Sequence, residues 1–487
     1  MGVSPFRNAA STFMNAASPF TNASLFRSTF ASEMLTSTEP HRLPPGPRGV
    51  PLLGMMPAIR RDPTGVFADA AHKYGDIAYL KIGPQQGYLV TRPDAIRHVL
   101  QDNARNYHKS PLYDKLKASL GNGLVTSEDA YWLRQRRMAQ PAFHRQRIEG
   151  LASVMVEASR ETAANWEPIA QRGEPIDVAE QMMQLTQAIV LRTLLGGDLG
   201  PLARELDQAW ALVNAHIGES FWSLGLTERW PTAKNKRFWR ALDVLDRAVF
   251  HIIDERRRGG QQTNDLLSML LYARDEDTGQ AMTDRQLRDE VMTILLAGHE
   301  TTSLALAWTW YLLSQHPEVQ RRLENELDAV LSGHTPGFAD LGNLQYTRMV
   351  IEEAMRLYPP AWGMSREAIG PDDIGGYHLP RGWLVFIVPF VMHRHPAYWE
   401  NPEQFDPTRF TPERSAARPK FVYIPFGAGP RQCIGNQFAM IEAQLVLATL
   451  AQRYRLTLVP GHPVEPWPLI TLRPRYGVRM TIARRPT

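Results

Sequence analysis

One long helical pattern constrains what this chain can fold into more than any other feature of its sequence. Thr283 and Gln286 have the spacing of a capping box, and an apolar pattern then continues to His316, where Pro317 ends it. A helix over these positions would have about 32 residues and a length of roughly 48 Å. Such a helix must cross the whole of a globular protein, so we expect the other elements to pack around it.

The middle of this helix carries polar groups within an otherwise apolar stretch. Residues 297–302 read Ala-Gly-His-Glu-Thr-Thr. Polar groups inside a protein are costly unless they are hydrogen-bonded or used. Gly298 lowers helix propensity by about 1 kcal/mol relative to Ala and lets another group approach the backbone. From this pattern alone, a solvent-facing patch at a kink and a functional site are equally open.

Composition excludes several classes of protein. The chain has 487 residues, a net charge of +4 and a hydrophobic content of 44%, as in ordinary soluble proteins. Its single cysteine excludes an internal disulfide, an all-cysteine zinc site and a self-contained iron–sulfur cluster. No apolar run spans a bilayer, no secretory signal is present, and no zinc-finger spacing or basic helix indicates nucleic acid. We therefore expect a soluble, cytoplasmic protein.

The first 40 residues differ in composition from the rest. They are rich in Ser, Asn and Ala, contain no acidic residue before Glu33, and repeat Phe and Asn every seven residues. Pro5 and Pro19 make a coiled coil unfavourable. We expect residues 1–40 to be a disordered low-complexity tail, with a transit peptide or a weak membrane-surface arm as alternatives. Residues 41–487 are predicted to form a single domain.

Periodicity predicts a mainly α fold with a minor β region. The pattern is mostly helical from Pro93 to about Leu331. Short runs rich in Ile, Tyr, Leu and Val predict strands at 76–83 and 88–92, within 377–388, and at 454–459 and 478–483. The folded part is therefore expected to be helix-rich with small sheets.

The only cysteine, Cys433, lies in a glycine-rich loop directly before a helical apolar pattern over residues 436–454. Free N–H groups and the helix dipole at such a position favour a thiolate. The flanking glycines permit a tight loop and the close approach of a flat ligand. A lone cysteine is usually a small buried apolar residue. With these glycines, Arg431 and the following helix, it indicates a metal-ligating thiolate instead.

These residues resemble a known family. The pattern Phe426-x-x-Gly429-x-Arg431-x-Cys433-x-Gly435 is similar to the haem-binding signature of the cytochrome P-450 family, and the resemblance extends from about Leu43 over nearly the whole chain. Further matches are residues 297–302 with the oxygen-activation motif, 353–356 with the ExxR motif, 405–410 with the segment that supplies its third member, and 132–136 with the WxxxR motif. The resemblance implies the cytochrome P-450 fold, with a long helix across the haem and small antiparallel sheets.

The resemblance also implies which residues hold the cofactor. Cys433 would be the axial thiolate ligand of haem b (iron protoporphyrin IX), and Phe426 and Gly435 would pack around the sulfur and the porphyrin. A thiolate ligand gives the iron electron density that favours O–O cleavage.

Haem brings two propionates that need cationic donors, and the planar fork of Arg can bind a carboxylate through two hydrogen bonds. By resemblance these donors are Arg136, Arg366 and Arg431, with the indole N–H of Trp132 in addition. A surface salt bridge is the alternative for each arginine.

Glu353 and Arg356 stand three residues apart on one helix face, where their side chains can meet. A generic surface pair would contribute only about 0–1 kcal/mol. The resemblance implies instead a buried network with Arg409 that fixes the segment leading to the cysteine loop. We expect this role to be structural and not catalytic.

Glu300 and Thr301 are the predicted catalytic residues. The resemblance implies that the Thr301 hydroxyl holds an ordered water near bound O₂ and that the Glu300 carboxylate relays protons from outside. An internal cap for a kinked helix is the alternative. The predicted activity is O₂-dependent hydroxylation or epoxidation of an apolar small molecule. A haem-thiolate isomerase or dehydratase and a non-enzymatic haem sensor or carrier are competing hypotheses.

Electrons are expected from a separate protein, because the sequence shows no flavin, ferredoxin or nicotinamide domain. A ferredoxin with its reductase is the first expectation and a flavodoxin-like donor the second. Residues 111–123, 294–297, 361–364 and 469–471 are expected around a largely apolar substrate pocket. A fatty acid, terpenoid, steroid or polyketide would fit that description.

Overall fold

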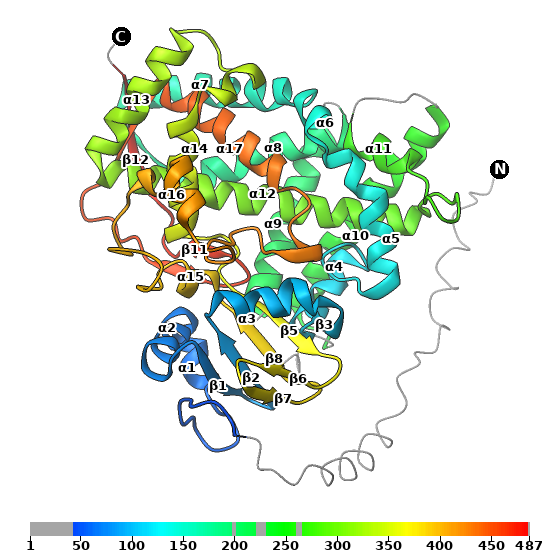
Figure 1. The fold of residues 1–487 in the computed structure, drawn as a ribbon. Helices are drawn as coiled ribbons and strands as arrows, with labels where there is room; N and C mark the ends of the chain where they lie inside the picture. The colour runs from blue at the N-terminus through cyan, green and yellow to red at the C-terminus, as the bar shows by residue number, and fades with distance from the viewer. Residues whose placement is uncertain (1–41, 197–200, 221–229, 260–264, 486–487) are drawn as a thin grey trace, which may run out of the picture. The chain divides into compact units, whose positions relative to one another are not determined.

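The predicted long helix is α12 (Asp284–Gln315), which runs through the middle of the helical part of the computed structural model (Figure 1). Thr283 caps it: the Thr283 hydroxyl accepts the Gln286 N–H at 3.3 Å, and the Gln286 side chain accepts the Thr283 N–H at 2.9 Å. His316 is the residue that follows the last turn. The capping box and the position of Pro317 thus set both ends of the helix, as predicted.

The structure describes residues 42–196, 201–220, 230–259 and 265–485, so the predicted tail 1–40 lies outside the described residues. Within them, Pro44 onward belongs to one unit that extends to the C-terminus. The other α-helices described are α1 (Met56–Arg61), α2 (Pro63–Tyr74), α3 (Pro93–Arg97), α4 (Lys117–Leu120), α5 (Asp129–Ala139), α6 (Arg145–Glu149), α7 (Ala152–Arg172), α8 (Val178–Leu195), α9 (Pro201–Ser220), α10 (Ala233–Gly259), α11 (Leu266–Tyr272), α13 (Pro317–Leu331), α14 (Gln345–Leu357), α15 (Pro389–Met392), α16 (Pro412–Ala417) and α17 (Asn436–Ala451).

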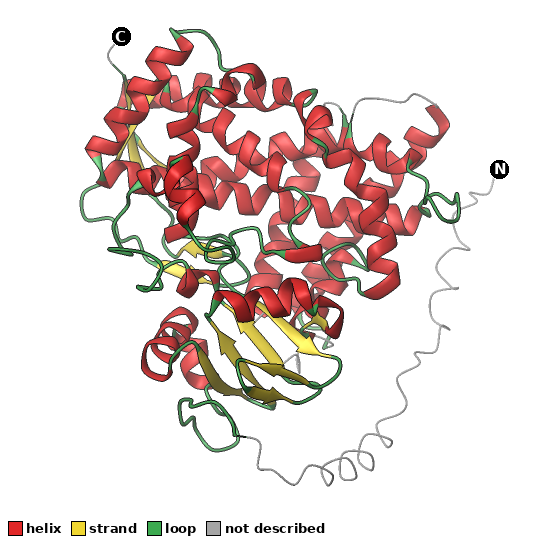
Figure 2. Cartoon of the chain, in the orientation of Figure 1, coloured by secondary structure: helices red, strands yellow, loops and turns green. Residues whose placement is uncertain are grey.

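The strands are short and gather mainly beside the helical part (Figure 2). They are β1 (Ile77–Ile82), β2 (Gln85–Val90), β3 (Tyr107–Lys109), β4 (Pro175–Asp177), β5 (Met364–Ala368), β6 (Asp372–Ile374), β7 (Tyr377–Leu379), β8 (Leu384–Ile387), β9 (Tyr454–Leu458), β10 (Pro466–Pro468), β11 (Leu472–Pro474) and β12 (Arg479–Arg484). The largest sheet has the order β1-β2-β8-β5-β3, and a three-stranded sheet has the order β4-β12-β9. The predicted mainly α fold with a minor β region is confirmed.

One pairing differs from the expectation of antiparallel sheets. Strands β2 and β8 pair in parallel, with Tyr88 opposite Val385. A parallel pair needs a long crossover connection, and here nearly the whole helical part of the chain separates the two strands. The remaining strand pairs, including the hairpin β10–β11, are antiparallel.

The core forms where helices pack on α12. Its closest partners are α8, α14, α17 and α10. Trp308 and Trp310 on α12 are fully buried, as is Trp166 on α7, and the apolar faces of these helices form one contiguous cluster. Burying a large aromatic side chain is among the strongest single contributions to a core. None of the described helices is both long and apolar enough to span a lipid bilayer.

Candidate active site

The cysteine loop is a tight turn held by its own backbone. Gly427 and Gly429 have φ values of +68° and +69°, a region that side-chain-bearing residues rarely adopt. A Cβ atom on Gly429 would lie 1.8 Å from the carbonyl oxygen of Leu100. The Cys433 N–H donates to the carbonyl of Phe426 at 2.9 Å and closes the loop. The glycines of the signature are therefore required to bring Cys433 to the start of α17.

The Cys433 thiol faces an internal space. The Cys433 side chain is accessible to solvent, although protein atoms surround it on nearly all sides. This combination is expected for a group that lines a space inside the fold. Burial raises the pKa of the thiol above its ordinary value, whereas the Gly435 N–H and the charge of Arg136 lower it. The N–H group at the start of α17 favours a thiolate, as expected, but in the protein alone burial outweighs it. A coordinated metal ion would ionise the thiol.

Three cationic side chains gather around one acid near the cysteine loop. Lys109 on β3 is the register partner of Arg366 on β5. Arg431 forms an ion pair with Glu128, and the Lys109 ammonium lies 3.7 Å from the same carboxylate. The pKa of Lys109 is lowered to about 7, chiefly by burial and also by the charges of Arg431 and Arg366, while Glu128 acts in the opposite direction. The cluster thus has a surplus of positive charge in a buried place.

The remaining predicted cofactor residues lie around the same loop. The guanidinium of Arg431 lies 4.3 Å above the ring of the buried Trp132. Arg136 donates to the carbonyl of Gln432 at 3.0 Å, directly before Cys433, whereas Arg366 and Arg431 belong to the cluster around Glu128. The half-buried Phe426 packs against the main core, and Gly435 is the residue before the first turn of α17.

Lys109 and Glu128 were not predicted from the sequence as residues of the site. Lys109 meets its partners only through the β3–β5 pairing and the loop before α5, so no local spacing indicates it. Residues 107–110 read Tyr-His-Lys-Ser, so no apolar stretch sets Lys109 apart either.

The middle of α12 has positions that are accessible to solvent. Ala297 is exposed and Thr301 is half-buried, although most residues of this helix are buried. Thr301 donates its hydroxyl to the Ala297 carbonyl at 2.7 Å. These two positions are four residues apart and share one helix face. A flat ligand held by Cys433 would find room on this face.

The two predicted catalytic residues do not point the same way. Glu300 is buried and turns toward the hairpin β10–β11, where it accepts hydrogen bonds from Thr471 and Arg473. Neighbouring positions on a helix do not face each other, so Thr301 and Glu300 are not in contact by this geometry. Thr471 was predicted only as part of the pocket segment 469–471, and Arg473 was not predicted, because both lie about 170 residues away from Glu300 in the chain.

The ExxR network is confirmed as buried and fully paired. Arg356 donates to both carboxylate oxygens of Glu353, at 2.7 and 2.8 Å, and Arg409 donates to the same carboxylate at 3.3 Å. Arg356 also donates to the carbonyls of Pro402 and Gln404, at 2.6 and 3.0 Å. The network therefore fastens the segment before the cysteine loop to α14.

His393 continues this network to the loop itself. Its carbonyl accepts from Arg356 at 2.9 Å, and its Nε2 accepts the backbone N–H of Ile424, two residues before Phe426, at 2.9 Å. Burial and the nearby charges of Arg356 and Arg394 lower the pKa of His393 to about 3. The histidine is therefore neutral at physiological pH and acts as a fixed acceptor.

A cavity of about 160 Å³ lies among the segments predicted to surround a substrate. Parts of residues 111–123, 361–364 and 469–471 contribute to its wall, together with residues of α1, α2 and β8, whereas the fourth predicted segment, 294–297, does not line it. Most of the lining side chains are apolar, among them Leu112, Leu116, Trp362, Leu469 and Ile470, so the cavity suits a largely apolar molecule. Gln85, Lys115 and Ser365 are polar members of the lining.

These features fit a haem group. The fold offers one sulfur ligand facing inward, an opening along α12, and buried cations in excess of acids, which two propionates would balance. The excess of buried positive charge is otherwise costly. The residues present therefore match the donor chemistry that haem requires.

Comparisons with known proteins agree with this geometry. The family model described as Cytochrome P-450 matches residues 44–478. Cyclooctatin synthase and cyclooctat-9-en-7-ol 5-monooxygenase of Streptomyces melanosporofaciens are 39% and 37% identical to the chain, covering 92% and 85% of it and 96% and 90% of their own lengths. Pentalenene oxygenase of Streptomyces avermitilis is 36% identical over 90% of the chain and 97% of its own length.

A solved structure, the crystal structure of a cytochrome P-450 heme domain, superposes with a TM-score of 0.83 at 28% identity, covering 92% of this chain and 99% of that one. The chain belongs to the cytochrome P-450 family. Its enzyme class is that of the cytochrome P-450 monooxygenases, which use a haem-thiolate cofactor, O₂ and a redox partner.

Proposed function

We propose that the protein is a haem-thiolate monooxygenase that oxygenates a terpenoid, with Cys433 as the axial ligand of haem b. The observation that carries the proposal is the single thiol of the chain, which faces an internal space beside a buried surplus of positive charge. When bound, the haem iron would supply O₂ activation, helped by the electron density of the thiolate.

The residues of the cysteine loop and those of the cation cluster would bind different parts of the haem group. Cys433 would ligate the iron, and Phe426 and Gly435 would pack against the porphyrin. Arg366, Arg431 and the indole N–H of Trp132 would bind the propionates, with Lys109 as an additional donor from the same cluster. Arg136 would also bind a propionate, as predicted, and its hydrogen bond to the carbonyl before Cys433 would fix the ligand.

Proton handling is assigned to two positions on α12. The Thr301 hydroxyl, on the opened face of the helix, would hold an ordered water at the reacting oxygen. The Glu300 carboxylate would pass protons inward from the side of the hairpin. Because the two side chains diverge, the path between them needs either a water or a turn of Glu300.

Several features favour a terpenoid over the other apolar substrates. The similar proteins from Streptomyces include cyclooctat-9-en-7-ol 5-monooxygenase and pentalenene oxygenase. The cavity wall includes the apolar side chains of Leu112, Leu116, Trp362 and Ile470, which suit a hydrocarbon skeleton. Lys115 lines the same cavity and could hold a carboxylate, so the preference for a terpenoid over a fatty acid rests on the similar proteins.

The test is a panel of apolar molecules offered to the haem-loaded protein. Cyclooctat-9-en-7-ol, pentalenene, a long-chain fatty acid and a steroid are titrated, and the haem absorption shift caused by loss of an iron-bound water is followed. The two terpenoids should shift the spectrum and, with NAD(P)H, a ferredoxin, its reductase and O₂, give oxygenated products. Product without reductant would support an isomerase or dehydratase instead, and binding without any product would support a sensor or carrier.

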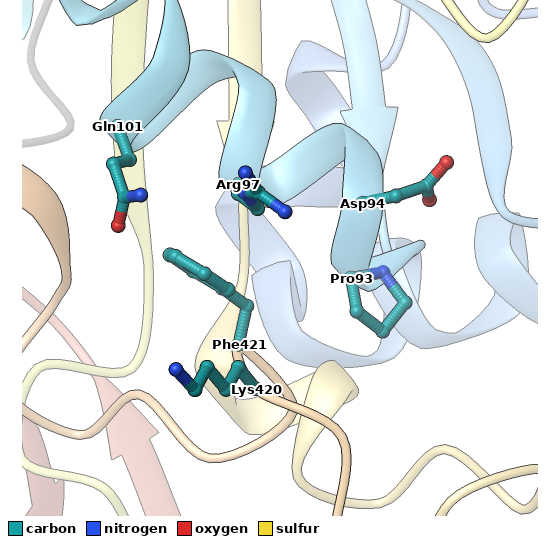
Figure 3. A pocket seen from close by; sticks show the side chains of 6 residues that line it. All are labelled: Pro93, Asp94, Arg97, Gln101, Lys420 and Phe421. Atoms are coloured by element: carbon teal, nitrogen blue, oxygen red, sulfur yellow. The ribbon is translucent and has the colours of Figure 1, made fainter.

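The electron donor would dock where the chain leads into the cysteine loop. A hollow of about 430 Å³ lies between α3 with the following turn of π-helix (His98–Asp102) and the segment before the loop (Figure 3). It is lined by Pro93, Asp94, Arg97, Gln101, Lys420 and Phe421. Leu100, in the same turn, touches Gly429 of the loop, which makes the route to Cys433 short. We assign this hollow to an acidic ferredoxin, with a flavodoxin-like donor as the second candidate.

A further inference from the structure

Glu300 is tied to a β-hairpin that lies far from it in the sequence. Its Oε1 atom accepts hydrogen bonds from the hydroxyl of Thr471 and from Arg473, whose Nε and Nη2 atoms lie at 3.0 and 2.7 Å. The Glu300 side chain is 7% exposed, and that of Arg473 is 30% exposed. The ion pair therefore connects a buried carboxylate to a cation that reaches the protein surface.

The same hairpin forms part of the cavity wall. Thr471 and Arg473 flank Leu472, whose carbonyl accepts the indole N–H of Trp308 at 2.9 Å. The tip of the hairpin, Leu469 and Ile470, lines the cavity. A molecule in the cavity that displaces the tip would therefore also displace Thr471 and Arg473, the two partners of Glu300, which follow the tip within a few residues.

The hydrogen bonds limit where Glu300 can take a proton. Oε1 accepts three donors, two of them from a guanidinium, and has no lone pair left for a proton. The proton must therefore be taken up and given off at Oε2. Thr471 and Arg473, by holding Oε1, fix the direction in which Oε2 points.

We infer that Arg473 is a positioning residue that, through Glu300, links proton delivery on α12 to the position of the hairpin and so to occupation of the cavity. The inference rests on the proposed function and extends it to a residue outside the family motifs. A molecule that presses on Leu469 and Ile470 moves the hairpin, and Arg473, which remains paired with Glu300, carries the carboxylate toward the opened face of α12 that holds Thr301.

The test compares three substitutions in the full-length, haem-loaded protein. Arg473→Met keeps the long apolar stem and removes the donors, Arg473→Lys keeps the charge, and Arg475→Met is the matched control. Arg475 lies in the same hairpin region and pairs with Glu465 at 3.6 Å, with both side chains 55% exposed. Product, peroxide and NAD(P)H consumption are measured in H₂O and D₂O, with cyclooctat-9-en-7-ol or the panel terpenoid that the unmodified protein oxygenates.

We expect Arg473→Met to lower product per NAD(P)H by about tenfold, the factor that corresponds to one charge-assisted hydrogen bond, and to raise peroxide accordingly. The solvent isotope effect on turnover should change in this variant, and Arg473→Lys should restore most of the coupling. Haem content and the affinity for the terpenoid, read from the absorption shift, should stay within about twofold of the unmodified protein. Arg475→Met should leave every readout unchanged.

A double-mutant cycle asks whether Arg473 acts through Glu300. If it does, adding Arg473→Met to Glu300→Gln has no further effect on coupling or on the isotope effect. Losses that add in the double variant would overturn the inference, as would unchanged coupling and isotope effect in Arg473→Met alone.

Hydrogen exchange supplies a readout that does not depend on turnover. Arg473→Met and Glu300→Gln should speed exchange in the hairpin, residues 466–474, to a similar extent, because each breaks the same ion pair. Faster exchange in only one of them would contradict the link. Absence of haem-thiolate absorption or of any product in the unmodified protein would instead refute the proposed function, so the two failures are distinguishable.

Discussion

The protonation state of Lys109 should depend on whether haem is bound. In the protein alone, burial and two arginines lower its pKa to about 7. Propionates bind the charged form, so haem binding raises this pKa. Haem affinity is then highest below about pH 7 and falls as the pH rises above it, because haem binding must be accompanied by proton uptake at Lys109.

The prediction is that the rate of haem transfer to an excess of apomyoglobin is about tenfold higher at pH 9 than at pH 6, a change that corresponds to about one pKa unit of linkage. In Lys109→Arg the cation stays charged, so the rate should change little with pH. If the transfer rate depends on pH equally in the unmodified protein and in Lys109→Arg, Lys109 does not bind a propionate.

Thr301 belongs to the same scale. Thr301→Ala removes the hydroxyl that donates to Ala297 and leaves Cys433 and the cation cluster untouched. We expect haem content and terpenoid affinity to stay nearly constant while product per NAD(P)H falls and peroxide rises, since the ordered water loses its partner. The matched control is Thr309→Ala, because Thr309 makes the same bond to Ala305, at 2.7 Å, at a buried position of α12. Equal uncoupling in both variants would point to the helix backbone and not to proton delivery.

Among the structural elements, the junction of α14 with the segment before the cysteine loop has the greatest effect on stability. Glu353→Gln leaves Arg356 and Arg409 buried without a counter-ion, a loss of about 3–5 kcal/mol. The variant should denature at a lower temperature and incorporate less haem. Glu352→Gln, which affects a pair with the exposed Arg348, should cost far less. Thermal unfolding and iron content measured on both variants check the prediction, and equal losses would contradict it.

Elements with local signals could be predicted from the sequence, and those that depend on partners could not. The bounds of α12 follow from a capping box and a proline that act within a few residues. The helix after Cys433 ends at Ala451 and not at Tyr454, because Tyr454 pairs with Arg484 in the sheet of β9 and β12. Strand β2 starts at Gln85, earlier than predicted, because Gln85 pairs with Ile82 although glutamine has little strand preference.

The same distinction between local signals and distant partners applies to the residues of the candidate active site. The cysteine loop, the ExxR pair and the polar centre of α12 are local motifs and are visible in the sequence. Lys109 and Arg473 act through partners brought together by strand pairing and by the hairpin. A single sequence carries no local trace of such contacts.

At the scale of the whole molecule, the electron donor must reach the side of the cysteine loop. Lys420→Glu reverses an exposed charge at the hollow of Figure 3 and should slow reduction by an acidic ferredoxin severalfold at low salt, with the difference shrinking as salt screens the charges. Lys236→Glu, an equal charge change at an exposed position of α10, serves as the control. Stopped-flow reduction rates of both variants test this prediction. Equal slowing of reduction in the two variants would mean that the donor docks elsewhere.

The central claim is that Cys433 is the thiolate ligand of a haem, and the absorption spectrum of the reduced, CO-bound protein tests it most directly. The unmodified protein should give a thiolate-type spectrum. Cys433→Ala should lose it completely, because the chain has no second cysteine, and Cys433→His should hold haem without the thiolate signature. A thiolate-type spectrum that persists in Cys433→Ala, or its absence from the unmodified haem-loaded protein, would contradict the account.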